Sequence, residues 1–220
     1  MRLVFLIPLF FVGVLPSSAQ QGKTIEQIEK DLVRLNGKGT NAGLRQQLLA
    51  MGKLDQRVRK PFETMFAKNA RPSEESVNAV NRTIEQTDRN LTQQLKEIVA
   101  KNGWPTIHLV GAEASSSAAI ILVHSPDREF QRHLLPELDI LVTERKIIGS
   151  DIAVLIDNLL IEDGKLQRFG TKFQVANGQA VLEPVEDPAH VDELRAKYML
   201  PSLEEFRKSF AKAFHVTAKD

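Results

Sequence analysis

Residues 72–105 read PSEESVNAVNRTIEQTDRNLTQQLKEIVAKNGWP and carry the strongest helix pattern in the chain. Ser73 can cap a helix, and the two glutamates that follow place negative charge where the helix dipole favours it. The pattern ends at Asn102-Gly103. Polar residues separate the members of one apolar stripe, so the segment predicts a surface helix roughly 40 Å long that organises the fold. The stripe contains Val77, Val80, Ile84, Leu91, Leu95 and Ile98.

Other helical patterns lie on both sides of this segment. Pro61 is expected to open or bend a helix, Pro136 to kink or divide one, and Ser150 and Ser202 to cap the helices that follow them. The remaining helices are predicted over residues 24–35, 44–51, 62–68, 111–124, 128–145, 151–162, 187–197 and 202–214.

Near the C-terminus the period of the pattern changes from helical to alternating. Apolar residues alternate from Phe169 to Val175, and Asn177-Gly178 separates them from Ala180-Val181-Leu182. Asn-Gly between two such runs is a strong hairpin signal. The predicted fold is therefore mainly α: a single-domain helical bundle with one long central helix and a C-terminal β-hairpin.

The first nineteen residues have the pattern of a secretory signal peptide. Met1-Arg2 precedes an apolar run over residues 3–15, and Ser17 and Ala19 are small residues suited to cleavage after Ala19. A membrane anchor is the alternative, but the run is shorter than the roughly 20 residues that cross a bilayer. We expect a secreted or periplasmic protein without a membrane span after signal removal. Its predicted parts are a signal peptide (1–19), a leader helix and linker (20–43), one helical domain (44–214) and a tail (215–220).

Composition excludes several classes of function. The 220 residues contain no cysteine, which excludes disulfides, thiolate metal sites and cysteine nucleophiles. Lys and Arg number 29 against 28 Asp and Glu, so the chain lacks the basic excess of a nucleic-acid binder, and we expect no nucleic acid as partner. Residues 44–72 are nonetheless basic and residues 126–164 acidic, a pattern typical of solvated faces and, less commonly, of a groove for an anion.

No sequence motif of a hydrolase, a phosphate-binding loop or a zinc protease is present, and we expect no cofactor and no metal site. His124 and Asp127 lie at a predicted helix end, where a histidine more commonly satisfies carbonyl groups than ligates a metal. Trp104 is interpreted as a rigid aromatic corner, with a stacking platform for a ligand as the alternative. Asp55 with Arg57, and Asp157, are polar positions beside apolar helix faces.

Several separated motifs in one order resemble a bacterial family of uncharacterised domains, from about Leu44 to Phe206. This resemblance implies a single helical domain and no particular reaction. Some polar positions depart from the family pattern, as at Val123-His124, Asp157-Asn158 and Phe169-Gly170-Thr171-Lys172. The motifs are Asp55-Gln56-Arg57-Val58-Arg59, Asp88-Arg89-Asn90, Gly103-Trp104-Pro105-Thr106, Leu109 to Ala114, His124 to Gln131, Gln167 to Thr171, and Glu186 to Arg195.

Two functions follow as hypotheses. The first is an exported binding or interaction domain of the cell envelope, whose partner is an envelope protein, a glycan or a small anionic ligand. The second is a hydrolase in which His124 acts as general base and Asp127 or Asp157 orients it. The candidate catalytic residues are His124, Asp127 and Asp157, and the candidate ligand-binding residues are Asp55, Arg57, Trp104, Gln167 and Thr171.

Overall fold

A computed structural model describes residues 25–66, 72–176, 179–213 and 217–219. The chain divides into two compact units, which are described separately. The helical unit is Leu32–Asp151, and the C-terminal unit combines Met1–Asp31 with Ile152–Asp220. The predicted fold class is confirmed, since the described chain is mainly helical and carries an antiparallel hairpin near its C-terminus. The predicted signal peptide and the hairpin turn Asn177-Gly178 lie outside the described residues.

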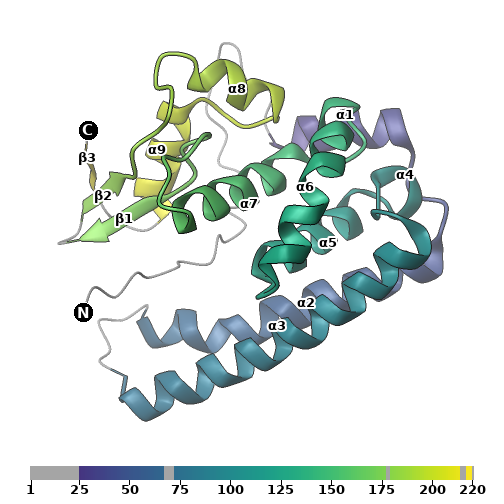
Figure 1. Ribbon diagram of the computed structural model, residues 1–220, viewed down its shortest axis with the longest axis horizontal. Helices are drawn as coiled ribbons and strands as arrows, with labels where there is room; N and C mark the ends of the chain where they lie inside the picture. Colours follow the sequence, from purple (N-terminus) through teal and green to yellow (C-terminus); the bar gives the residue numbers. More distant parts are fainter. Residues whose placement is uncertain (1–24, 67–71, 177–178, 214–216, 220) are drawn as a thin grey trace. The chain divides into compact units, whose positions relative to one another are not determined.

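The helical unit is built around two long helices. Contacts join α2 to both α3 and α5, and Figure 1 shows α2 and α3 lying side by side. The last turn of α1 and the start of α7 also belong to this unit. The helices are α1 (Ile25–Asn36), α2 (Ala42–Phe66), α3 (Glu74–Asn102), α4 (Ile107–Val110), α5 (Ala112–His124), α6 (Arg128–Thr143) and α7 (Gly149–Glu162).

The predicted long helix is confirmed as α3. Ser73 caps it, because its side chain accepts a hydrogen bond from the backbone N–H of Ser76. Gly103 ends it with a φ of 70°, a conformation that favours glycine. Leu91, Leu95 and Ile98 of the predicted stripe are buried, so the second half of α3 contributes most of this apolar stripe to the core.

Two predictions about helix boundaries are wrong, and for Pro136 the structure excludes the division of the helix, one of the two predicted alternatives. Residues 42–66 form one helix with Pro61 inside it, whereas two helices were predicted. Proline removes one backbone hydrogen bond, and burial of Leu48 and Met51 along α2 favours a continuous helix over a break. Pro136 likewise lies inside an undivided α6. Ser150 does not cap α7, which already begins at Gly149.

The glycine-rich segment between α1 and α2 is hydrogen-bonded to α4. The backbone N–H groups of Thr40 and Asn41 donate to the Leu109 carbonyl at 3.0 and 2.8 Å. A β-carbon on Gly39 would lie 2.6 Å from the Gly111 nitrogen, and Gly39 has a φ of 95°, so this position requires glycine. The segment predicted as a linker is therefore packed closely against the helical unit.

The C-terminal unit combines the rest of α7 with a small sheet and two helices. Strands β1 (Phe173–Ala176) and β2 (Gln179–Leu182) form the predicted hairpin, with Phe173 opposite Leu182. Strand β3 (Thr217–Lys219) pairs with β2 in parallel and was not predicted. Helices α8 (Val191–Lys197) and α9 (Leu203–Ala213) complete the unit, and Ser202 caps α9 as expected through the N–H of Glu205.

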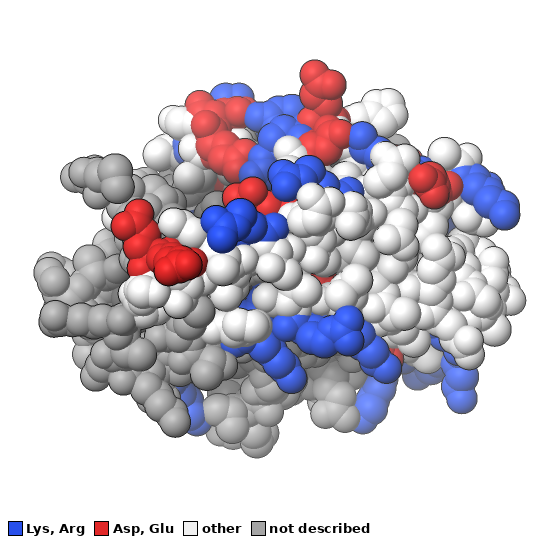
Figure 2. All heavy atoms as spheres, turned by 90° about the horizontal axis from the view of Figure 1, so that it is seen from below, with Lys and Arg blue, Asp and Glu red and all other residues white. Residues whose placement is uncertain are grey.

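Two surface properties bear on function. Of the helices that the structure describes, none is both long enough and apolar enough to cross a membrane. On the face drawn in Figure 2, lysine and arginine side chains lie in several groups, some of them beside acidic side chains. That face therefore presents separate basic groups interrupted by other side chains.

Candidate functional site

Asp55 and His124 form a buried pair in the helical unit. Asp55 projects from α2 and is fully buried, and His124 is the last residue of α5. The Nδ1 atom of His124 lies 2.9 Å from Oδ1 of Asp55, although 69 positions separate the two residues. The same oxygen is 2.8 Å from the Arg59 guanidinium, and Gln56 donates to the other carboxylate oxygen at 2.9 Å. Both oxygens of this buried carboxylate thus have hydrogen-bond partners.

Arg59 links this pair to α3. Its guanidinium is 2.7 Å from Oδ1 of Asp88, and the side chains of Arg59 and Asp88 are only 6% and 13% exposed. Burial raises the pKa of the Asp88 carboxyl above its usual value, although the hydrogen bond and charge of Arg59 act in the opposite direction. The cluster Asp55, Arg59, Asp88 and His124, which we call the polar cluster, therefore joins helices α2, α3 and α5.

His124 keeps part of its side chain accessible, with 17% exposed. Its Nδ1 atom is taken by Asp55, and Nε2 makes no hydrogen bond to any residue that the structure describes. A carboxylate on one ring nitrogen fixes the orientation of the ring and leaves the other nitrogen for a further partner. The arrangement is that of an oriented imidazole at the edge of the core.

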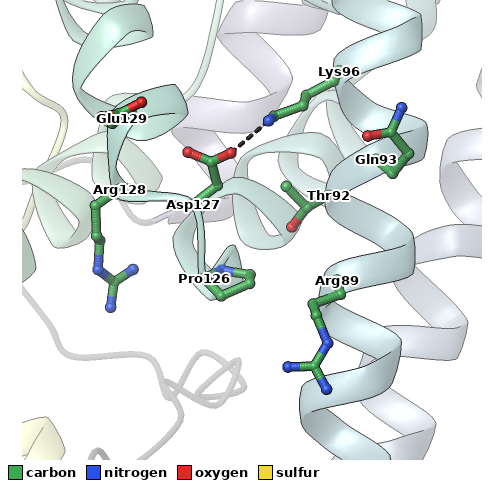
Figure 3. A pocket seen from close by; sticks show the side chains of 8 residues that line it. All are labelled: Arg89, Thr92, Gln93, Lys96, Pro126, Asp127, Arg128 and Glu129. Atoms are coloured by element: carbon green, nitrogen blue, oxygen red, sulfur yellow. Dashed lines mark hydrogen bonds and ion pairs between the residues drawn. The ribbon is translucent and has the colours of Figure 1, made fainter.

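An open hollow of about 520 Å³ is lined by residues that neighbour two members of the polar cluster in the sequence. One wall comes from α3 and the other from the start of α6, as Figure 3 shows. Asp88 of the cluster precedes Arg89 of the hollow, and His124 lies two residues before Pro126. The lining residues are Arg89, Thr92, Gln93, Lys96, Pro126, Asp127, Arg128 and Glu129.

Asp127 is held on the α6 wall of the hollow. Its carboxylate caps α6 by accepting from the N–H of Phe130 at 2.9 Å, and Lys96 reaches it from α3 at 2.5 Å. The hydrogen bond from Lys96, followed by the one from Phe130, holds the pKa of the Asp127 carboxyl below its usual value. Lys96 therefore neutralises Asp127. The lining also contains Arg89, Glu129 and Arg128, and the guanidinium of Arg128 donates to the Ser125 carbonyl and to the side chain of Gln131 at 2.8 and 3.0 Å.

Thr92 carries an unusual hydroxyl group. The residue is 5% exposed, and its Oγ1 atom is buried without a hydrogen-bond partner among the described residues. In Figure 3 the side chain lies between Arg89 and the Lys96–Asp127 pair, with its oxygen directed toward the Pro126 side of the hollow. Burying a hydroxyl without a hydrogen-bond partner costs about 1–3 kcal/mol, so this group is an exception among buried polar side chains.

A second polar arrangement lies within the C-terminal unit. Asp157 of α7 is fully buried, and its carboxylate accepts hydrogen bonds from the N–H groups of Arg168, Phe169 and Thr171 and from the Thr171 hydroxyl. Gln167 is also fully buried and bonds the backbone of Lys172 in both directions. These contacts shape the loop before β1, which is a structural task.

Two cations near Asp157 are withdrawn from water, Arg195 fully and Lys172 in part. Desolvation lowers the pKa of the Lys172 ammonium to about 8, against the charges of Asp157 and Glu162. Desolvation also lowers the pKa of the Arg195 guanidinium to about 10. Arg195 is fully buried and donates to the Phe169 and Pro201 carbonyls, and one of its terminal nitrogens has no partner among the described residues. Arg195 therefore ties the loop to the end of α8.

Residues 42–219 match the sequence model of DUF6624, a family of unknown function. The chain belongs to this family. None of the curated proteins and none of the solved structures matches the chain. Both polar arrangements and the hollow lie inside the part of the chain that DUF6624 covers.

The structure distributes the predicted site residues of this DUF6624 member over different places. Asp55 contacts His124, whereas Asp127 contacts Lys96 and Asp157 contacts its own loop together with Thr171. Asp55 is therefore the carboxylate that orients His124, and neither Asp127 nor Asp157 holds that position. Gln167 belongs to the C-terminal unit.

Two other predicted ligand-binding residues lie apart from these contacts. Arg57 is exposed on α2. The arginine that forms the ion pair with Asp55 is Arg59, two residues further along the chain. Trp104 is 3% exposed, its indole N–H is buried without a partner among the described residues, and it does not line the hollow beside the polar cluster. Its position is that of a core residue.

Arg59, Asp88 and Thr92 were not predicted as site residues, although Arg59 and Asp88 belong to the motifs that resemble the family. The pair Asp55 and Arg59 had a readable signal, because a carboxylate and an arginine four residues apart on a helix lie on one face. Asp88 and Thr92 had no such signal, since their roles depend on how α3 packs. Among the described residues no group of three or more side chains is arranged to hold a metal ion.

Proposed function

We propose that this protein is an exported binding domain of the cell envelope that recognises a small anionic group in the hollow between α3 and α6. The observation that carries the proposal is the unpartnered, buried hydroxyl of Thr92 in a hollow with three basic side chains in its lining. Carboxylate and phosphate groups are the small anions that accept hydrogen bonds from hydroxyl and guanidinium donors at once.

Charge supports an anion rather than a cation. The lining has Arg89, Lys96 and Arg128 against Asp127 and Glu129, and Lys96 already neutralises Asp127. Arg89 is 55% exposed, and its ion pair with Glu85 is long, at 3.9 Å. A long, exposed ion pair contributes little and is readily exchanged for a ligand. Arg89 can therefore turn to a bound anion at small cost.

Export is supported by the N-terminal sequence alone, where a basic residue, an apolar run and a small-residue cleavage pattern follow one another. Mass spectrometry of the protein recovered from the periplasm or medium of an expressing bacterium tests it. The proposal expects a chain that begins at Gln20. An uncut chain in the membrane fraction would contradict it and favour an anchor.

Binding is tested by NMR titration of ¹⁵N-labelled protein with sodium phosphate and, separately, with sodium succinate, at constant ionic strength set with sodium chloride. The first variant is Arg89→Gln, and the matched control is Arg57→Gln, which removes the same charge from an exposed position on α2. A hydrogen bond to a charged group contributes about 1.5–3 kcal/mol, so Arg89→Gln should weaken binding about tenfold or more. The control should bind as the wild type does.

The pair of variants separates two sites. Equal loss in Arg57→Gln and Arg89→Gln would show binding through general charge and contradict the hollow as the site. Weaker binding in Arg57→Gln alone would place the ligand on the exposed side of α2 that carries Arg57.

A further inference from the structure

We infer that His124, oriented by Asp55, is a general base that hydrolyses an acyl bond of the anionic compound bound in the neighbouring hollow. This inference rests on the proposed binding function and adds a reaction to it. The substrate class is a carboxylic ester or amide that also carries a carboxylate or phosphate group.

The imidazole of His124 has the geometry of a general base. A general base needs a fixed ring, a free nitrogen and access to water. Asp55 fixes the ring through Nδ1 at 2.9 Å and is itself held by Arg59 and Gln56. Nε2 has no partner among the described residues, and the side chain is 17% exposed. All three requirements are met by this one pair.

The pair also lies beside the hollow. On α3, Asp88 of the polar cluster and Thr92 of the hollow are four residues apart, so they lie on one face and about 6 Å apart along the helix axis. After α5, only Ser125 separates His124 from Pro126 of the lining. A small molecule whose anionic group binds at Thr92 and Arg89 therefore has its next few atoms beside the polar cluster.

The reaction is hydrolysis of the acyl bond. Nε2 of His124 takes a proton from a water molecule while the water oxygen forms a bond to the acyl carbon. The tetrahedral intermediate then collapses, the bond from the acyl carbon to the leaving oxygen or nitrogen breaks, and the imidazolium returns the proton to that leaving atom. Asp55 holds the ring through Nδ1 and stabilises the imidazolium that forms. The products are a carboxylic acid and an alcohol or amine, and His124 ends in its starting form.

A second histidine provides a matched comparison within the same chain. His190 of the C-terminal unit also has its Nδ1 atom 2.9 Å from a carboxylate, that of Asp187, but both side chains are more than 60% exposed. A buried carboxylate restrains a ring, whereas an exposed pair exchanges freely with water. The substitution His190→Gln therefore removes a histidine that has the same contact with a carboxylate as His124 but lies on the surface.

The experiment follows release of 4-nitrophenol from mono-4-nitrophenyl succinate, an anionic ester, and from neutral 4-nitrophenyl acetate, using the full mature chain. The wild type should hydrolyse the anionic ester with saturation. His124→Gln, which keeps a donor for Asp55, should lower kcat about 10²-fold or more with little change in KM, and His190→Gln should not differ from the wild type. Circular dichroism and thermal unfolding of His124→Gln verify that it folds.

The outcomes distinguish this inference from the binding function. If the NMR titration shows anion binding but the wild type hydrolyses the anionic ester no faster than His124→Gln does, the catalytic inference is overturned and the binding function stands. If Arg89→Gln raises KM for the anionic ester and leaves the acetate ester unaffected, both are supported. If the chain neither binds succinate nor hydrolyses the ester, both are overturned.

Discussion

Replacing Thr92 by valine should make the protein more stable and its binding weaker. Valine has the shape of threonine without the hydroxyl, and the two residues have similar helix propensities. Thr92 is 5% exposed, and its buried Oγ1 has no partner among the described residues, so folding leaves this hydroxyl desolvated and unpaired. Such a group costs about 1–3 kcal/mol, which is the gain expected from its removal.

The gain is measurable. For a chain of this size, 1 kcal/mol corresponds to a shift in Tm of about 2–4 °C, so Thr92→Val should raise Tm by several degrees. Urea unfolding gives the free energy directly. The control is Thr83→Val on the same helix, because the hydroxyl of Thr83 is exposed and donates to the Ala79 carbonyl at 3.1 Å. This control should change stability by less than about 0.5 kcal/mol.

Binding provides the second half of the prediction. An anionic ligand that accepts a hydrogen bond from the Thr92 hydroxyl should bind Thr92→Val more weakly by about tenfold or more, because a hydrogen bond to a charged group contributes about 1.5–3 kcal/mol. A stabilised protein with weaker binding is the expected signature of a group kept for function. If Thr92→Val is instead destabilised by more than 1 kcal/mol, the hydroxyl has a structural partner and the reasoning fails.

Three further predictions concern buried charges. Asp157→Asn should lower the free energy of unfolding by about 2–4 kcal/mol, because the Asp157 carboxylate accepts four hydrogen bonds. Urea unfolding measures this change, with Asp163→Asn at the exposed end of α7 as the control. Equal stability of the two variants would contradict the prediction. The folded protein binds a proton at Asp88 more tightly than the unfolded chain, so wild-type stability should fall relative to Asp88→Asn as pH rises above about 4; a constant difference across that range would refute this. Lys172 has a pKa of about 8 in the folded state against 10.5 when unfolded, so the unfolded chain binds more protons between these values. Stability should therefore rise with pH from 8 to 10.5, and a rise that persists in Lys172→Met would assign it to another group.

Local patterns predicted most of the helices and the hairpin. Helix α3 could be read from its cap, its apolar stripe and its terminal glycine, all of which act within a few residues. The continuity of α2 through Pro61 could not, because the packing that outweighs one lost hydrogen bond comes from α3 and α5. Strand β3 was missed because it depends on pairing with β2, more than 30 residues earlier in the chain.

The candidate site was predictable only in part. His124 and Asp55 could each be selected as polar residues beside apolar helix faces, but only the packing of α2 against α5 brings them together. That packing also decided which carboxylate orients the histidine, and spacing along the sequence favoured Asp127 instead. The unpaired hydroxyl of Thr92 is a property of the folded core that no local pattern expresses.

The most direct test of the binding function is the NMR titration of ¹⁵N-labelled wild-type protein with sodium phosphate and with succinate at constant ionic strength. We expect saturable shifts in the backbone amides of Arg89 to Lys96 and of the first turn of α6, and we expect Arg89→Gln to reduce them and Arg57→Gln to leave them unchanged. Shifts that do not saturate, or that sodium chloride reproduces, would contradict an anion site in the hollow.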